Sequence, residues 1–395
     1  MTDKEKYQEL LVGPIERFDQ RNDMFRRTRY DPEWVKRAGT FYDPMQPRDK
    51  DGYRLEEQAL VDAAWYVEDQ CARGCQGSSH PGLYAWQAAT TRPQQVQMGE
   101  GPRAQPAGAS PTSDLRVDVY DLGEVTKKVK RAARFFGASL VGVCGLDHRW
   151  LYSQVSDDIT GEHNPLDLPE GVQSAVVMAV EMDYDLMQTA PTGGAAAATG
   201  LGYSTMAFLA GLLARFIRNL GYQALPCGND TALSIPLAVE AGLGELGRNG
   251  LLITKEFGPR VRLCKVFTDL ALVPDEPRFF GVGEFCRVCQ KCADDCPSRA
   301  ITYGERTTEA LNISTNPGVL KWPVNAEQCF KYWVANGLDC SICIRVCPFN
   351  QEAGWLHDAV RMGIKHTPWL DRLFLWFDGV AGYGKQQDPE TIWDG

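Results

Sequence analysis

Apolar and polar positions follow regular patterns in the middle of the chain and irregular ones toward its ends. Leu122–Phe136 has the pattern of a helix that ends at Gly137, and Tyr203–Leu220 predicts a second, stronger helix that ends at Gly221. Short apolar runs predict strands at Ser139–Val143, Ser174–Val180, Tyr222–Leu225 and Arg260–Leu272. Helices and strands therefore alternate in this region, which indicates an α/β core, and the fold class expected for the whole chain is α+β.

Different compositions flank this core on both sides. In the first part, Gly52–Asp69 predicts a helix, and the Pro-, Gly- and Gln-rich residues 91–114 predict a long surface loop or extended arm. Most cysteines follow the core, and the last residues are rich in tryptophan. The predicted organisation is a variable N-terminal region at 1–114, the core at 115–275, a cysteine-rich domain at 276–350 and a tail packed on the body at 351–395.

Charge and hydropathy narrow the possible partners. The formal net charge is −10 at pH 7, which argues against nucleic acid, because phosphate binding relies on clustered Lys and Arg. The longest apolar stretch, Thr205–Ala214, is much shorter than the roughly 20 residues that span a bilayer. Arg26-Arg27 is followed by Thr28–Asp31 rather than by an apolar segment, so no export signal is predicted.

Eight of the 13 cysteines fall in two motifs with a specific spacing. The first is Cys286-x2-Cys289-x2-Cys292-x3-Cys296-Pro, and the second is Cys329-x10-Cys340-x2-Cys343-x3-Cys347-Pro. Two-residue spacers let one tight loop present three thiolates to a 4Fe–4S cube, while a helix starting near Pro297 is expected to carry the fourth cysteine to the neighbouring cluster.

The spacing predicts two clusters with crossed ligands. The first would bind Cys286, Cys289, Cys292 and Cys347, and the second Cys296, Cys329, Cys340 and Cys343. The alternative is a pair of zinc sites, but zinc usually takes Cys-x2-4-Cys pairs separated by a longer gap. The sequence therefore predicts a ferredoxin-like domain.

A glycine-rich segment, Gly242-x-Gly244-x-x-Gly247, matches the letters of a dinucleotide-binding fingerprint. That site requires a strand before the glycines and a helix after them. Here Pro236–Ala241 predicts a helix and Leu251–Thr254 a strand, so the order is reversed and nicotinamide or flavin binding is not predicted.

Several segments together resemble the respiratory corrinoid reductive dehalogenases, with the epoxyqueuosine reductases as relatives. The resemblance covers residues 120–350 and is carried, besides the cysteine motifs, by Gly202–Ala207, Leu225–Asp230, Ser234–Val239, Gly242–Leu252 and Gly258–Val266. It implies a nitroreductase-like corrinoid-binding core, a base-off cobalamin and two 4Fe–4S clusters. The cofactor contacts it implies are Ser234, Gly242, Gly244, Gly247, Asn249, Val261 and Leu263.

The same resemblance implies three catalytic residues, Tyr203, Arg262 and Asn229. Tyr203 would donate the proton in R–X reduction, Arg262 would stabilise the tyrosinate, and Asn229 would orient the phenol or receive the halide. We expect Tyr203 in the first turn of its helix, where the macrodipole favours an anion and lowers the phenol pKa. Aromatic candidates for the substrate pocket are Trp333, Phe41, Trp65 and Trp86.

The expected activity is therefore reductive dehalogenation of a small organohalide. The alternatives are an epoxyqueuosine-type reductase acting on tRNA and an electron-transfer protein without catalysis. The expected partners are a low-potential electron donor and a small membrane-anchor protein, a homodimer is left open, and no nucleic acid is expected. Family members act at the outer face of the cytoplasmic membrane as peripheral proteins, so we expect this chain to represent a form without the export signal.

Overall fold

A computed structural model describes residues 2–39, 41, 50–72, 116–156, 163–166, 168–352 and 354–393. Its centre is a four-stranded sheet in the order β1-β4-β8-β5, in which all neighbouring strands are antiparallel. The strands are β1 (Leu140–Gly145), β4 (Ser174–Glu181), β8 (Val261–Thr268) and β5 (Ala224–Cys227). The four strands predicted from the sequence are thus confirmed, with small shifts at their ends.

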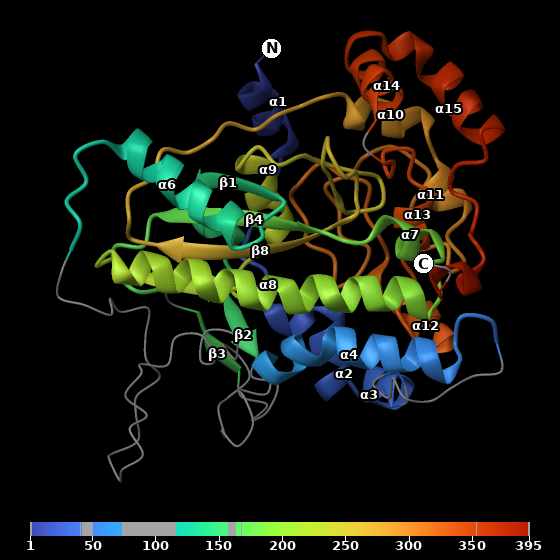
Figure 1. Cartoon of the computed structure of the whole chain (residues 1–395), viewed down its shortest axis with the longest axis horizontal. Helices are drawn as coiled ribbons and strands as arrows, with labels where there is room; N and C mark the ends of the chain where they lie inside the picture. The colour runs from blue at the N-terminus through green and yellow to red at the C-terminus, as the bar shows by residue number, and fades with distance from the viewer. Residues whose placement is uncertain are drawn as a thin grey trace.

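Two helices cover one face of this sheet, α6 (Leu122–Phe135) and α8 (Gly193–Asn219). Val129 of α6 and Met206 of α8 are fully buried against Val176 and Cys264 of the sheet. The helix α4 (Leu55–Ala72) runs alongside α8 on the side away from the sheet (Figure 1). Among the described residues, α8 alone is long and apolar enough to cross a membrane, but it is a core helix with 72% of its most apolar window buried.

The helix α8 begins ten residues before the predicted start at Tyr203, which corrects the sequence-based prediction. Small residues make this possible, because they let the chain pack closely against its neighbours. A Cβ on Gly200 would lie 2.4 Å from the Trp65 ring, and one on Gly193 would lie 2.6 Å from the Glu57 side chain. The Gly/Ala-rich stretch is therefore a close helix–helix contact rather than a loop.

The opposite face of the sheet is covered by α9 (Ser234–Glu240), η3 (His148–Trp150) and α1 (Asp3–Leu10). Trp150, Leu237 and Phe267 are buried together there. The remaining N-terminal helices are η1 (Gln20–Asn22), α2 (Met24–Tyr30) and α3 (Pro32–Ala38). A short helix, α7 (Tyr184–Gln188), precedes α8. Two small two-stranded sheets complete the core: β2 (Gln154–Ser156) pairs with β3 (His163–Pro165), and β6 (Glu245–Leu246) pairs with β7 (Leu252–Ile253).

The cysteine-rich domain lies at one end of the sheet (Figure 1) and consists of short helices joined by turns. They are α10 (Val282–Val288), α11 (Lys291–Asp294), α12 (Ala326–Asn336) and α13 (Ile342–Arg345). The helix expected from Pro297 is wrong. The Arg299 N–H instead donates to the Cys296 carbonyl at 3.1 Å, and Arg299 adopts φ +53°, so the chain turns after Cys296.

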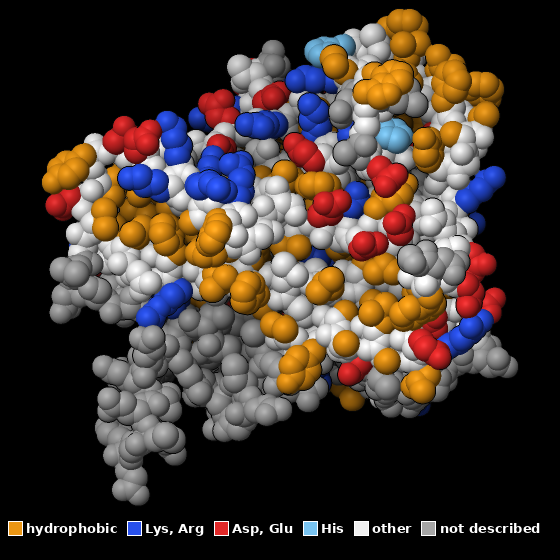
Figure 2. All heavy atoms as spheres, viewed as in Figure 1, with side chains coloured by type: hydrophobic (Ala, Val, Ile, Leu, Met, Phe, Trp, Pro, Cys, Tyr) orange, Lys and Arg blue, Asp and Glu red, His pale blue; other side chains and the backbone are white. Residues whose placement is uncertain are grey.

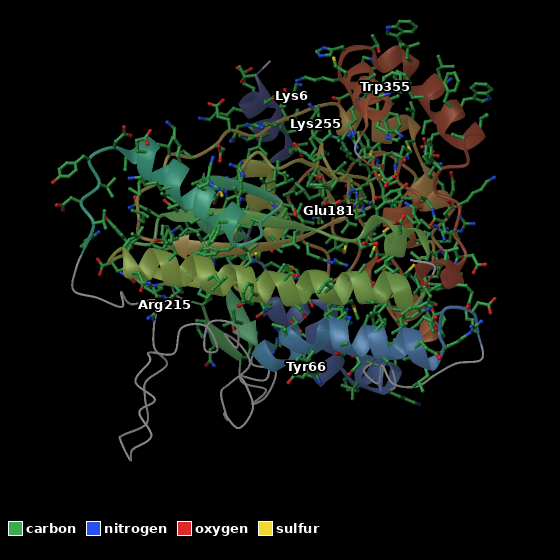
Figure 3. The ribbon with its side chains drawn as sticks, in the orientation of Figure 1. Lys6, Tyr66, Glu181, Arg215, Lys255 and Trp355 are labelled. Atoms are coloured by element: carbon green, nitrogen blue, oxygen red, sulfur yellow. The ribbon has the colours of Figure 1, made fainter. Side chains whose placement is uncertain are left out.

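The tail forms α14 (Trp355–His366), η4 (Pro368–Leu370), α15 (Asp371–Val380) and η5 (Pro389–Trp393). Ile364 and Phe374 of the tail pack against Val282 and Phe285 of the cysteine-rich domain. Its outer surface is apolar (Figure 2). Trp355, labelled in Figure 3, is 82% exposed. The domain boundaries given above stay a prediction.

Candidate active site

The eight motif cysteines fall into two groups of four by their mutual electrostatic contacts. In the first group, Cys292 and Cys347 both lie close to Cys286 and Cys289. We call these four cysteines the distal set, because they lie further from the cavity described below. The proximal set is Cys296, Cys329, Cys340 and Cys343, since Cys343 lies close to the other three. These groups have the same members as the crossed sets predicted from the spacing, and their ligation of clusters stays a prediction.

The two sets are adjacent, because Cys343 also lies close to Cys292 and Cys347 lies close to Cys343. Burial raises the pKa of the Cys286 thiol to about 11 and that of Cys329 to about 12. Ligation by iron requires thiolates, so the metal itself must stabilise the charged form.

The spacing between these thiols differs from that of a zinc site. Four thiolates on one zinc ion each lie about 2.3 Å from it and therefore close to one another. The described part of the chain contains no group of three or more His, Cys, Asp or Glu side chains that could hold a single metal ion. The double-cluster spacing of the eight cysteines, rather than a zinc-type pairing, remains the basis for the iron–sulfur assignment.

A cavity of about 1010 Å³ lies beside the proximal set. Its wall reaches from Tyr7 in α1 to Asp339, and Trp333 and Asp339 bring it next to the ligands Cys329 and Cys340. No cysteine of either set lines the cavity; the residue directly before a proximal ligand, Asp339, does, whereas no residue adjacent in sequence to a distal ligand does. The proximal set is therefore the one nearer the cavity, and the distal set lies further away.

All three predicted catalytic residues line the cavity, and Asn229 and Arg262 each contact Tyr203. The Asn229 Nδ2 donates a hydrogen bond to the Tyr203 hydroxyl at 2.8 Å. The Arg262 guanidinium carbon lies 5.0 Å from the centre of the Tyr203 ring, and its Nη2 donates to Thr199 Oγ1 at 3.2 Å. The Arg262 Nε is buried and has no hydrogen-bond partner among the described residues, so one donor is available to a bound group.

The electrostatics of Tyr203 differ from the expectation. Because α8 starts at Gly193, Tyr203 lies in the third turn, where the helix dipole gives little help to an anion. Burial raises the pKa of the Tyr203 phenol above its usual value, while the Arg262 charge and the Asn229 hydrogen bond act to lower it. The phenol is therefore held in its protonated form at neutral pH, as a proton donor requires.

Aromatic side chains form much of the cavity wall. Trp65 stacks on Tyr203 with ring centres 4.9 Å apart and an interplanar angle of 23°. Phe41 stacks on Trp333 at 6.1 Å, and all three candidates Phe41, Trp65 and Trp333 line the cavity. Trp86 lies outside the described residues.

A buried lysine, which the sequence did not single out, supports the loop that carries Asn229. The Lys265 ammonium is fully buried and donates to the Gly228 carbonyl at 2.5 Å, the Ala232 carbonyl at 2.9 Å and Ser234 Oγ at 3.0 Å. Ser234 lines the cavity, as predicted for a cofactor contact.

The other predicted cofactor contacts are not among the residues that line the cavity, and their role as cofactor contacts stays a prediction. A Cβ on Gly244 would lie 2.2 Å from the Ile253 carbonyl oxygen, one on Gly242 2.5 Å from that of Glu276, and one on Gly247 2.8 Å from the Ile253 side chain. These glycines allow close backbone packing. Within the same segment, Leu246 and Gly250 do line the cavity.

The remaining three candidates are also directed elsewhere. Asn249 is buried, and its Nδ2 donates to the carbonyl of the proximal ligand Cys343 at 3.3 Å. Val261 and Leu263 of β8 are buried in the hydrophobic core together with Leu237. Their alternation with Arg262 along the strand places them on the opposite face of the sheet from the catalytic candidate.

Asp339 is a site residue that the sequence reasoning missed. Its Oδ2 accepts hydrogen bonds from Thr199 at 3.0 Å and Ser341 at 3.1 Å, and Arg262 lies close enough to act on its charge. Burial raises the pKa of this carboxyl. The one available signal was its position directly before the ligand Cys340.

Residues 285–350 match the family model of a 4Fe-4S double cluster binding domain. The chain is 41% identical over 303 residues to the tetrachloroethene reductive dehalogenase of Sulfurospirillum multivorans, which covers 70% of this chain and 60% of that protein. It is 42% identical over 306 residues to the tetrachloroethene reductive dehalogenase of Desulfitobacterium hafniense, covering 68% of this chain and 55% of that protein.

The chain is also similar to a solved reductive dehalogenase structure, which is described as suggesting a mechanism for B12-dependent dehalogenation. The two chains are 25% identical in sequence, and their superposition has a TM-score of 0.72. The match covers 95% of this chain and 48% of that chain. The chain thus spans about half to 60% of the length of these relatives. The sequence identity, the shared fold and the double cluster domain together show that this α+β protein is a homologue of the reductive dehalogenases.

Proposed function

We propose that the chain catalyses reductive dehalogenation of a small organohalide, R–X + 2e⁻ + H⁺ → R–H + X⁻. The observation that carries this proposal is the contact between Tyr203, Asn229 and Arg262 in a cavity whose wall includes residues next to the proximal cluster ligands. A proton donor thus lines a space whose wall lies next to the proximal cluster ligands. The substrates named for the relatives are chlorinated ethenes.

The cavity suits a large cofactor together with a small substrate. Its volume of about 1010 Å³ lies at the upper end of the roughly 300–1,000 Å³ of ligand pockets, and the Arg262 Nε supplies a buried donor without a partner among the described residues. A cobalamin bound there would supply low-valent cobalt as the reductant of the carbon–halogen bond. Ser234, Leu246 and Gly250 would hold it.

The protein residues then have separate tasks. Tyr203 holds the proton that carbon receives, since its raised pKa keeps the phenol protonated. Arg262 stabilises the tyrosinate that remains after transfer, because its fixed charge lies over the ring. Asn229 orients the phenol through its hydrogen bond. Trp65 and Phe41 exclude water from the reacting centre, which prevents competing protonation.

Metal analysis and halide release test this proposal together. The purified protein, reconstituted with iron, sulfide and cobalamin, is expected to bind one cobalt with its clusters and to release chloride from a chlorinated ethene under a strong reductant. A panel of chlorinated methanes, ethanes, ethenes and phenols would define the substrate class. Cluster spectra without any corrinoid uptake would favour the electron-transfer alternative and overturn the proposal.

We also propose peripheral attachment to the outer face of the cytoplasmic membrane through the α14–α15 face. Trp369 is 78% exposed and Val380 is 68% exposed, and the face is visible at the upper right of Figure 2. Asp371 and Asp378 are buried, whereas Arg372 is exposed, so this apolar face carries little negative charge on an otherwise acidic chain. The face consists of Trp355, Met362, Trp369, Leu373, Trp376, Phe377 and Val380.

Flotation with vesicles containing phosphatidylglycerol tests this attachment. The protein is expected to float with the vesicles, and the double variant Trp369→Ser, Trp376→Ser is expected to stay in solution. Equal behaviour of the two proteins would show that attachment does not depend on this face and would favour capture by a membrane-anchor protein at another surface.

A further inference from the structure

The glycine-rich segment contains a buried arginine that the proposed reaction does not use. Arg248 is only 2% exposed and follows β6. Its Nε and Nη2 donate to the carbonyl oxygen of the distal ligand Cys286 at 3.0 and 2.8 Å. Its Nη1 donates to the carbonyls of Thr302 at 2.7 Å and Tyr303 at 2.6 Å. The guanidinium therefore lies directly against the loop that holds the distal set.

The positive charge of Arg248 has no carboxylate counter-ion among the described residues. All of its hydrogen-bond acceptors are backbone carbonyls, and no carboxylate in the described part of the chain lies within ion-pair distance of it. It also stacks on Trp322, with 4.4 Å from its guanidinium carbon to the ring centre. An arginine is always charged, and burying its charge without a partner is costly. A group that carries negative charge next to Arg248 would offset that cost.

A 4Fe–4S cluster with four thiolate ligands is such a group. One-electron reduction changes its total charge from −2 to −3, so a fixed positive charge nearby stabilises the reduced form. We propose that Arg248 raises the reduction potential of the distal cluster and makes it the site where an incoming electron rests. This inference rests on the cluster assignment within the proposed function, and it is independent of whether the chain releases halide.

Other charged side chains lie around the distal set. Arg306 stacks on the same Trp322, 4.5 Å from the ring centre. Lys291 is neutralised by its ion pair with Asp378. Glu245 acts in the opposite direction, but its carboxylate accepts hydrogen bonds from the backbone N–H groups of Phe280 and Val282. In the described part of the chain, Arg248 is the cation whose side chain donates hydrogen bonds to a distal ligand.

The proximal set provides a matched comparison. Arg345 lies close to Cys340 and donates to the Ala190 carbonyl. It is only partly buried, whereas Arg248 is almost completely buried, so solvent screens its charge more. We therefore expect the distal cluster to accept an electron before the proximal cluster, which then passes electrons to the cavity.

Redox titration followed by electron paramagnetic resonance tests the proposal on the reconstituted full chain, without substrate. Arg248→Gln is expected to lower the equilibrium constant for one-electron reduction of one cluster at least tenfold. This corresponds to a fall of about 59 mV in its reduction potential. Arg248→Lys retains the charge and is expected to stay within threefold of the wild type. Arg345→Gln is expected to shift the other cluster by less.

Equal shifts in Arg248→Gln and Arg248→Lys would show that the hydrogen-bond geometry matters and the charge does not, and would overturn the proposal. An unchanged potential in Arg248→Gln would do the same. If Arg248→Gln does not assemble four irons per site, Arg306→Gln is the second variant. It is expected to lower the same potential by a smaller amount, and no shift there would also contradict the role of charge.

Discussion

The eight cluster cysteines come from residues 286–347, whereas the cavity beside them is lined by residues as far apart as Tyr7 and Asp339. In the cysteine-rich domain, short spacers and turns set the ligand positions locally. In the cavity wall, Tyr203 comes from α8, Asn229 from the segment after β5 and Arg262 from β8. The clusters should therefore tolerate changes in the cavity, while the catalytic geometry depends on how the sheet and helices pack.

The strongest test of this comparison is Tyr203→Phe. The variant keeps the ring that stacks on Trp65 and loses only the hydroxyl that accepts from Asn229. Dehalogenation is expected to fall by about 10³-fold or more, because general-acid catalysis is worth about 10²–10⁴-fold. Iron content, cobalt content and cluster spectra are expected to remain at wild-type levels.

The matched control is Tyr222→Phe, which removes a hydroxyl bonded to the Val117 carbonyl outside the cavity. It is expected to keep its activity. Full activity in Tyr203→Phe would mean that the proton comes from another donor, and lost clusters would mean that the two regions are not separable.

The same contrast explains what the sequence could predict. The cluster sets followed from spacing alone, and the six elements α6, α8, β1, β4, β5 and β8 followed from hydrophobic patterns, although the start of α8 was misplaced because glycine and alanine also suit loops. The neighbours of Tyr203 followed only from a resemblance. Asp339 and Lys265 were missed, because their roles depend on contacts with residues distant in sequence.

The next largest effect is expected from Arg262→Met. Its charge lowers the pKa of Tyr203, which burial raises, so removing it raises that pKa further. The maximal rate is expected to fall about 10²-fold, as for loss of one charge-stabilising donor. Since a proton donor works below its pKa and fails above it, the alkaline limit of activity should move to higher pH. A pH–rate profile with an unchanged alkaline limb would separate Arg262 from the phenol.

Gly244→Ala distinguishes a packing role from a cofactor role of the glycine-rich segment. Its Cβ would lie 2.2 Å from the Ile253 carbonyl oxygen, so the β6–β7 hairpin must shift. The free energy of unfolding is expected to fall by about 2–3 kcal/mol. Gly145→Ala is the control, because nothing lies within 4 Å of its Cβ. A stable Gly244→Ala protein that has lost only cobalamin binding would restore the cofactor interpretation.

The smallest expected effect concerns the contact that joins the two regions. Arg27 in α2 forms an ion pair of 2.5 Å with Glu327 in α12, the helix that carries the ligand Cys329, and a second one of 2.8 Å with Asp31. Glu327→Gln keeps the shape of the side chain but removes its negative charge from a largely buried ion-pair network. The free energy of unfolding is expected to fall by about 1–2 kcal/mol.

Glu33→Gln breaks the exposed pair with Arg37 and serves as the control, with an expected change below about 0.5 kcal/mol. Urea unfolding measures both variants. Because Phe25, next to the α2 start, contacts Trp333 on the cavity wall, Glu327→Gln is also expected to raise KM more than it lowers kcat. A changed spectrum of the proximal cluster, which Cys329 ligates, with an unchanged KM would contradict the predicted rise in KM. It would show that α2 supports the helix α12 and not the cavity wall.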